Sequence, residues 1–166
     1  MRAKARLLGH PIHPMLVVFP LGLLTVAAIF DLVYVCTHGS HWADLSYWMI
    51  AAGIIGGLIA AIFGAIDWFG IPQGTRAKYI GLIHGLSNVI AVILFIISWA
   101  MRRLNPAAPE MTAMILGWIG IVMALFASWL GGELVYRLNV GVDHGANLDA
   151  PNSLSGRPTV EAVGRR

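Results

Sequence analysis

The chain has 166 residues, of which 58% are hydrophobic and 11% are charged. Soluble domains average roughly 45–50% apolar and about 25% charged residues, so this composition indicates an integral membrane protein rather than a soluble one. The formal net charge of +3 comes from cations that flank apolar stretches, so it gives no reason to expect a nucleic-acid partner. Cys36 is the only cysteine, which excludes an internal disulfide and a cysteine-ligated metal or iron–sulfur site within the chain.

Four apolar stretches are long enough to cross a bilayer as helices, which takes about 20 residues each. The sequence therefore predicts an all-α fold, a four-transmembrane-helix bundle with spans at about 14–36, 44–69, 78–101 and 111–136. Together they form a transmembrane domain of residues 1–138. Residues 139–166 are poorer in apolar residues and richer in Gly, Asn, Pro and Ser, so we expect a flexible polar tail there.

The positive charges are unevenly distributed over this topology. Only Arg102 and Arg103 fall on one side, and the other Lys and Arg residues all fall on the opposite side: Arg2, Lys4, Arg6, Arg76, Lys78, Arg137, Arg157, Arg165 and Arg166. The positive-inside rule then predicts that both termini are cytoplasmic. The first apolar stretch is long for a signal peptide and no small-residue cleavage site follows it, so we expect it to be a span.

The first span opens with two histidine–proline pairs, in GHPIHPMLVVFPLGL. A residue before proline disfavours the α conformation, so we expect His10 and His13 to be extended, with His13 as the N-cap and Pro14 at the first helical position. An imidazole held there would serve as a ligand, a proton acceptor or a polar cap.

The second span contains Gly53 and Gly57, four residues apart. Such a small face lets another helix approach closely in lipid, although it would also make room for a flat cofactor. Asp67 lies near the inner end of this span. In the loop before it, His38 and His41 are expected to be ordinary polar loop residues rather than a surface metal site.

The third span carries His84 inside the membrane. Ionisable side chains within a span are costly and usually face the bundle interior. Gly81 and Gly85 flank this histidine, and small neighbours would leave space for a bulky group at the imidazole. The alternative is a structural histidine that bonds to a neighbouring helix.

The last span ends with Glu133 and Arg137, which can pair on one helical face because they are four residues apart. Each half of the chain begins with a histidine-bearing helix and ends with an acid-bearing one. Two loosely repeated helical hairpins of this kind would bring two histidines and two carboxylates towards a shared axis.

Three functions fit this pattern. In a b-type haem site, His13 and His84 would be the axial ligands, Gly81 and Gly85 would accommodate the macrocycle, and Arg76 and Arg137 would pair with the propionates. A non-haem site would hold iron, manganese or zinc, or handle protons, through a mixed set of groups: His10, His13, His84, Asp67 and Glu133. The third is a cofactor-free structural subunit of a larger membrane complex.

The motifs GHPIHPMLVVFPLGL, FGAIDW, HGLSN and WLGGELVYRLNVGVD, in this order, resemble the small four-helix bacterial membrane proteins catalogued as domain of unknown function 2231. The resemblance covers about residues 8–143 and implies a multi-pass protein of the bacterial inner membrane. Its motif positions here are His10, His13, Asp67, His84 and Glu133. One departure is Leu138, near which the pattern would have a further histidine.

The resemblance also implies a membrane partner of redox modules, because related domains are joined to Rieske-type or cytochrome-type segments. Our leading expectation is therefore a membrane redox subunit that binds haem b and exchanges electrons with a quinone or a partner protein. Whether the chain catalyses a reaction, and whether it dimerises through its glycine faces, stays open.

Overall fold

The computed structural model describes residues 1–159 and contains four long helices: α1 (Ile12–Thr37), α2 (Ser40–Phe69), α3 (Arg76–Arg102) and α4 (Met111–Gly132). A two-residue hairpin of β1 (Arg6–Leu7) and β2 (His10–Pro11) precedes α1, and a short π-helix, η1 (Glu133–Arg137), extends α4. Four helical segments are long and apolar enough to cross a membrane. The predicted all-α, four-span fold is confirmed. The predicted tail beyond residue 159, with Arg165 and Arg166, lies outside the described residues.

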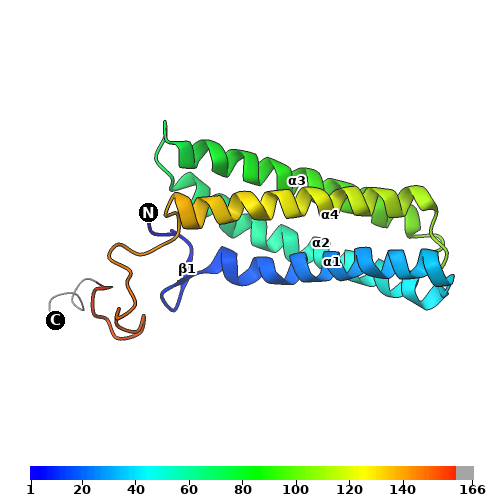
Figure 1. The fold of residues 1–166 in the computed structure, drawn as a ribbon, viewed down its shortest axis with the longest axis horizontal. Coiled ribbons are helices and arrows are strands. Elements are labelled where there is room, and N and C mark those ends of the chain that lie inside the picture. Colours follow the sequence, from blue (N-terminus) through cyan, green and yellow to red (C-terminus); the bar gives the residue numbers. More distant parts are fainter. Residues whose placement is uncertain (160–166) are drawn as a thin grey trace.

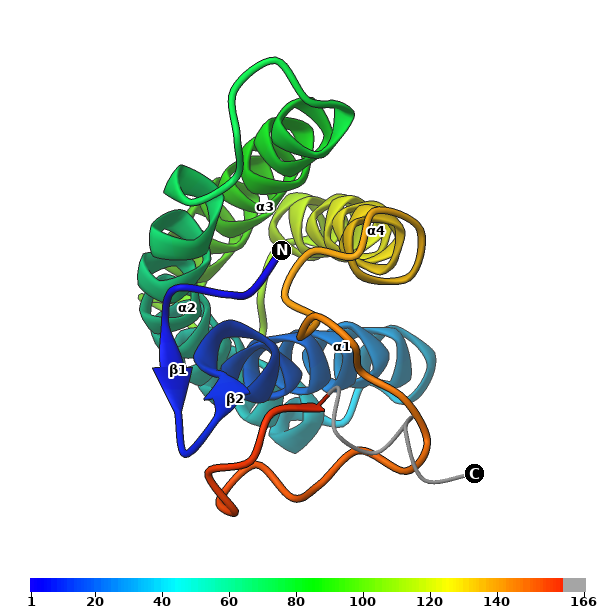
Figure 2. The same cartoon turned by 90° about the vertical axis from the view of Figure 1, so that its left-hand side faces the viewer.

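The helices form two antiparallel hairpins that lie side by side (Figures 1 and 2). In one hairpin α1 packs along α2, and in the other α3 packs along α4. The N-terminus, the α2–α3 turn and the tail after η1 lie at one end of the bundle, here called the terminal end, and the other two turns lie at the opposite, loop end. The N-terminus and the described part of the tail therefore lie at the same end, while their cytoplasmic location stays a prediction.

The helix α1 begins at Ile12, two residues earlier than expected. Pro11 is the last extended residue (φ −61°, ψ 131°), so His13 lies in the first helical turn and its predicted role as N-cap is wrong. The N–H groups of a first turn have no intrahelical acceptor, so Pro14 sacrifices no hydrogen bond there. His10 is extended in β2, as expected.

The two hairpins repeat one packing plan. Arg102 lies 71 positions after Asp31, and the same separation relates other positions of α1 and α3: His13 to His84, Leu24 to Phe95, and Ala27 to Ser98. A second constant separation relates α2 to α4: Gly53 to Gly120, Ala60 to Ala127, and Gly64 to Gly131. Positions related in this way occupy matching sites in the two hairpins. The expected repeat is thus stronger than the sequence motifs alone indicate.

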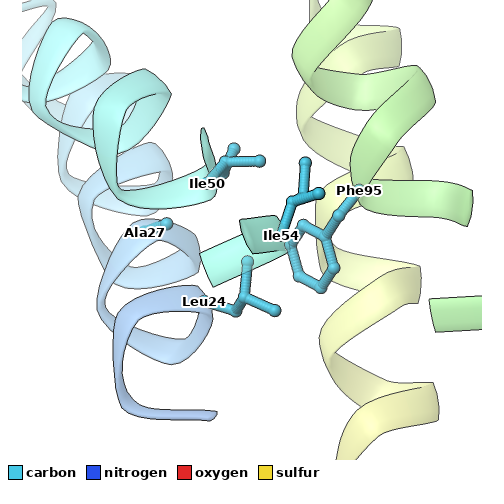
Figure 3. Packing of buried hydrophobic residues seen from close by; sticks show 5 residues of the cluster. All are labelled: Leu24, Ala27, Ile50, Ile54 and Phe95. Carbon is cyan, nitrogen blue, oxygen red and sulfur yellow. The ribbon is translucent and has the colours of Figure 1, made fainter. Parts of the chain in front are cut away.

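Interdigitation of large and small residues builds the core (Figure 3). Leu24 and Ala27 of α1 and Ile50 and Ile54 of α2 meet Phe95, which α3 contributes from the other hairpin. A Cβ atom at Gly53 would lie only 2.6 Å from the Leu24 side chain. The predicted packing role of Gly53 is therefore confirmed.

Candidate functional site

His13 and His84 meet near the terminal end of the bundle. Their ring centres are 6.2 Å apart and the ring planes are perpendicular, at 90°. The two residues come from different hairpins, His13 from the first turn of α1 and His84 from α3, and both are half-buried. The structure therefore brings together the two histidines that the sequence analysis selected.

Each imidazole is oriented by a backbone carbonyl of the other helix in its own hairpin. The Nδ1 atom of His13 lies 2.9 Å from the carbonyl oxygen of Ala60, and that of His84 lies 2.8 Å from the carbonyl oxygen of Ala127. Because a carbonyl oxygen can only accept, each Nδ1 carries a proton, and in the neutral ring each Nε2 then presents a lone pair. Asn88 contributes a weaker contact, since its Nδ2 lies 3.4 Å from Nε2 of His84.

A glycine lies one helical turn beyond each of these carbonyl groups. A Cβ atom at Gly64 would be 3.0 Å from both Cε1 and Nδ1 of His13, and one at Gly131 would be 3.3 Å from Cε1 of His84. Each ring thus packs directly against helix backbone. The sequence analysis missed this role of Gly64 and Gly131, although comparison of the two halves at a constant separation would have paired them.

The two glycines that flank His84 in the sequence have different surroundings. Gly81 packs against Trp68, whose Cδ1 would be 2.8 Å from an added Cβ atom. Gly85 is exposed and an added Cβ atom there would have no neighbour within 4 Å. Gly64 and Gly131 on the facing helices are the glycines that the imidazole rings contact, and the role of Gly81 and Gly85 in accommodating a macrocycle stays a prediction.

Asp67 binds the N-terminal segment. Its Oδ1 atom accepts the backbone N–H groups of Lys4 and Ala5 at 2.7 and 2.9 Å. His10 lies at the surface, where its Nε2 is 3.3 Å from Oγ of Ser153 in the tail. Asp67 thus binds the backbone of the N-terminal segment, and His10 lies beside the tail.

Glu133 pairs with Arg76 across the α3–α4 hairpin, at 2.7 Å, so the alternative pairing with Arg137 is wrong. The reason is local: η1 is a π-helix, in which Leu138 donates to the Glu133 carbonyl, and this wider turn changes the four-residue register. Arg137 is exposed. Within residues 1–159, no group of three or more His, Cys, Asp and Glu side chains is placed to hold a metal ion.

The α2–α3 turn carries an open hollow of about 530 Å³ at the same end of the bundle. Trp68, Tyr79 and Leu82 contribute its apolar lining, and Lys78 and Thr75 contribute polar groups. The Lys78 ammonium donates to the Trp68 carbonyl at 2.8 Å and lies 3.8 Å from the centre of the Trp68 indole ring.

The tail binds the N-terminal segment through backbone hydrogen bonds of Met1 with Asn139 and Gly141, and through a clasp at the carboxylate of Asp143. Asp143 accepts hydrogen bonds from Arg6 and from Arg2, at 2.6 and 2.8 Å. The hydrogen bond from Arg6, supported by Arg2, lowers the pKa of Asp143 to about 2, and the same bond raises the pKa of Arg6. The described part of the tail is thus anchored at residue 143.

A second polar centre lies in the half of the bundle that ends at the loop end, here called the loop half. It contains Arg102, which follows directly after the predicted third span of 78–101. Arg102 instead ends α3, is 1% exposed, and forms two hydrogen bonds with Asp31 of α1, at 2.6 and 2.7 Å. Oγ of Ser46 and Oγ of Ser98 lie 3.2 and 3.1 Å from its guanidinium. The sequence could not reveal this ion pair, because it depends on how α1 and α3 are aligned.

These features define the molecule as a four-helix membrane protein with two internal polar centres, a histidine pair and an ion pair. A family model described as "Predicted membrane protein (DUF2231)" matches residues 9–144, so the chain belongs to that family. The resemblance noted from the sequence motifs is confirmed. No curated protein and no solved structure matches the chain.

Proposed function

We propose that the protein is an integral membrane redox subunit that binds one haem b between His13 and His84. Electrons would pass to or from a quinone or a partner protein. The observation that carries the proposal is the pair of imidazoles from different hairpins, each with Nδ1 bonded to a backbone carbonyl. Metal-ligating histidines characteristically donate their second ring N–H in this way, which fixes the ring and raises its basicity.

The separation of the rings supports the same proposal. Two imidazoles that bind one metal ion from opposite sides, with metal–nitrogen bonds of about 2 Å, have their ring centres roughly 6 Å apart. The ring centres of His13 and His84 are 6.2 Å apart. Little change in their spacing is therefore needed for both to bind the same iron.

The residues around the two histidines would position the haem and shield it from water. Bound haem would supply reversible one-electron transfer, and its potential would depend on the axial ligands and their hydrogen bonds. Arg76 and Arg137, at the terminal end, are the candidates to pair with propionates, and Arg76 would then be shared with Glu133. The apolar helices around the histidines would restrict water.

The hollow beside the α2–α3 turn supports the quinone part of the proposal. Its volume lies within the range of about 300–1,000 Å³ that is usual for small-ligand sites. Trp68 and Tyr79 offer aromatic surface, and Trp68 packs against Gly81, one turn from His84. A quinone head group bound there would lie beside Trp68, which packs against the histidine-bearing helix α3.

The test is a reduced-minus-oxidised absorption spectrum of the purified protein, with metal analysis alongside. We expect the sharp reduced bands of a b-type cytochrome, and their loss in His84→Ala and in His13→Ala. His10→Ala is the matched control and should keep the bands, because His10 lies at the surface beside Ser153. A folded but colourless, metal-free preparation from haem-replete cells would contradict the proposal.

One observation favours a cofactor-free structural subunit as the second candidate. Three carboxylates of the bundle already have partners: Asp67 has two backbone N–H groups, Glu133 has Arg76, and Asp31 has Arg102. For non-haem iron, manganese or zinc, or for proton handling at the mixed site, Asp67 and Glu133 would have to serve the site while these partners already occupy one oxygen of each carboxylate. The absorption spectrum and the metal analysis together distinguish bound haem, a non-haem metal ion and a metal-free protein.

A further inference from the structure

The Asp31–Arg102 ion pair joins the two hairpins far from the histidine pair. Both residues are only 1% exposed, and the carboxylate accepts hydrogen bonds from both Nη1 and Nη2 of the guanidinium. The bond to Ser46 adds α2 to the contact between α1 and α3. The proposed haem site uses none of these side chains, so the ion pair needs an explanation of its own.

The spacing along the two helices relates the ion pair to the histidines. Asp31 follows His13 by 18 residues, and Arg102 follows His84 by the same 18. Eighteen residues are five full turns of an α-helix and rise by about 27 Å. Each charged residue therefore lies on the same face of its helix as the histidine of that helix.

A buried bidentate ion pair tolerates little sliding between helices. A shift of α1 against α3 by one turn, about 5.4 Å, would break both hydrogen bonds and leave two unpaired charges in an apolar interior. Apolar contacts such as the one between Leu24 and Phe95 exchange more readily for other apolar contacts. The ion pair is thus the feature that most strongly selects one alignment of α1 and α3.

The surroundings of the ion pair are fitted closely to it. A Cβ atom at Gly117 of α4 would lie 3.6 Å from Nη2 of Arg102 and 3.8 Å from Oδ2 of Asp31. Ala28 lies one turn before Asp31 in α1. Its carbonyl accepts a hydrogen bond of 3.1 Å from Nε1 of Trp118, which joins α4 to α1. The loop half therefore fixes where the hairpins meet.

We infer that Asp31 and Arg102 are positioning residues, which set α1 and α3 level with each other and thereby hold His13 opposite His84. The functional meaning of this role rests on the proposed haem site. Whether positions 13 and 84 lie opposite each other can, however, be measured without haem. A failure of the positioning proposal can therefore be distinguished from a failure of the haem proposal.

The test places cysteines at the two histidine positions in the full chain. The background is Cys36→Ser with His13→Cys and His84→Cys, and the readout is the rate at which a short bifunctional thiol reagent links the two cysteines within one chain. A neutral variant adds Asp31→Leu and Arg102→Met, and a reversed variant adds Asp31→Arg and Arg102→Asp. Thermal unfolding is followed for each.

The neutral variant is expected to remain folded, because well-packed apolar residues often replace a buried ion pair without loss of stability. Its cross-linking rate should nevertheless fall roughly tenfold, the factor that corresponds to about 1.4 kcal/mol of lost alignment preference. The reversed variant should restore the rate, because positions 31 and 102 are equivalent in the two hairpins and the reversed residues again carry opposite charges.

A folded neutral variant that cross-links at the original rate would overturn the inference. If the neutral variant does not fold, the reversed variant decides: folded protein with slow cross-linking overturns the inference, and restored cross-linking supports it. With the histidines intact, the neutral changes should also lower haem retention. If the unaltered protein binds no haem while cross-linking behaves as expected, the positioning role stands and the haem proposal falls.

Discussion

Each histidine of the central pair depends on two residues of a facing helix that contribute backbone rather than side-chain chemistry. Ala60 and Ala127 supply carbonyl oxygens, and Gly64 and Gly131 supply close approach. His84 could be selected from the sequence because an ionisable side chain inside a span is conspicuous. Its partners could not, because alanine and glycine are common in membrane helices and only the interhelical register gives them a role.

Alanine at Gly64 should disturb the histidine site more than alanine at Gly131. The new Cβ would lie 3.0 Å from the His13 ring in the first case and 3.3 Å from the His84 ring in the second. Overpacking of this kind costs about 1–3 kcal/mol. We expect a lower unfolding temperature and lower haem content, with the larger effect for Gly64→Ala. Gly85→Ala is the control, and an equal loss in that variant would refute the explanation.

The clasp at Asp143 should respond to pH only in the acid range. An unfolded aspartate has a pKa of about 3.9, whereas that of Asp143 is lowered to about 2. A lowered folded-state pKa stabilises the clasp fully above the unfolded value, and this contribution is lost as the pH falls from about 4 towards 2.

Hydrogen exchange of the tail, measured by mass spectrometry, tests the pH dependence of the clasp. We expect protection of the segment around Asp143 to be constant from pH 7 to about pH 4.5 and to fall at lower pH, once the intrinsic exchange rates are corrected for. Asp143→Asn should show reduced protection at neutral pH and no further step in acid. A loss of protection between pH 7 and 5 would contradict the assignment of the pH dependence to Asp143.

At the scale of elements, close packing of α1 on α2 rests on glycines opposite bulky residues. Gly53 accommodates Leu24, and its counterpart Gly120 in α4 accommodates Phe95. The four-residue spacing of small residues was sufficient to predict a packing face on α2. The end of α4 was not predictable in the same way, because a π-helix has no clear sequence signature and its wider turn removed the expected Glu133–Arg137 pair.

Gly53→Ala should therefore destabilise the first hairpin. The added Cβ would lie 2.6 Å from Leu24, which is buried and cannot easily move, so a loss of about 1–3 kcal/mol is expected. The measurement is unfolding in detergent or lipid, followed by helix content. Gly22→Ala in α1 is the matched control, since nothing lies within 4 Å of its added Cβ. Similar destabilisation by both changes would show that glycine itself, rather than close packing, matters.

At the scale of the whole molecule, length and hydropathy were enough to predict four helices, their order, and that the N-terminus and the tail after the last helix lie at the same end. The two hairpins are a parallel repeat, and its strength appeared only when matched positions were compared in space. Asp31 and Arg102 show why: they are equivalent positions with opposite charges, and no local pattern links residues so far apart in the chain.

The distribution of Lys and Arg residues predicts the orientation of the protein in the membrane. The experiment uses a Cys36→Ser background and cells whose outer membrane is permeabilised while the inner membrane stays intact. A membrane-impermeant thiol reagent added outside should then label Ser40→Cys. Ala146→Cys, in the tail at the terminal end, should be labelled only after the inner membrane is permeabilised. Both sites are exposed. The reverse labelling pattern would place the termini outside the cytoplasm.

The most direct test of the account is electron paramagnetic resonance of the oxidised, purified protein, combined with its haem content. Two neutral imidazoles bound to one iron give a low-spin ferric signal, and the perpendicular planes of His13 and His84 predict the strongly anisotropic form of that signal. We expect one haem per chain with this signal, and its disappearance when either histidine is replaced by alanine. A folded protein that takes up no haem, or one whose low-spin signal survives both replacements, would contradict the assignment of His13 and His84 as the paired ligands.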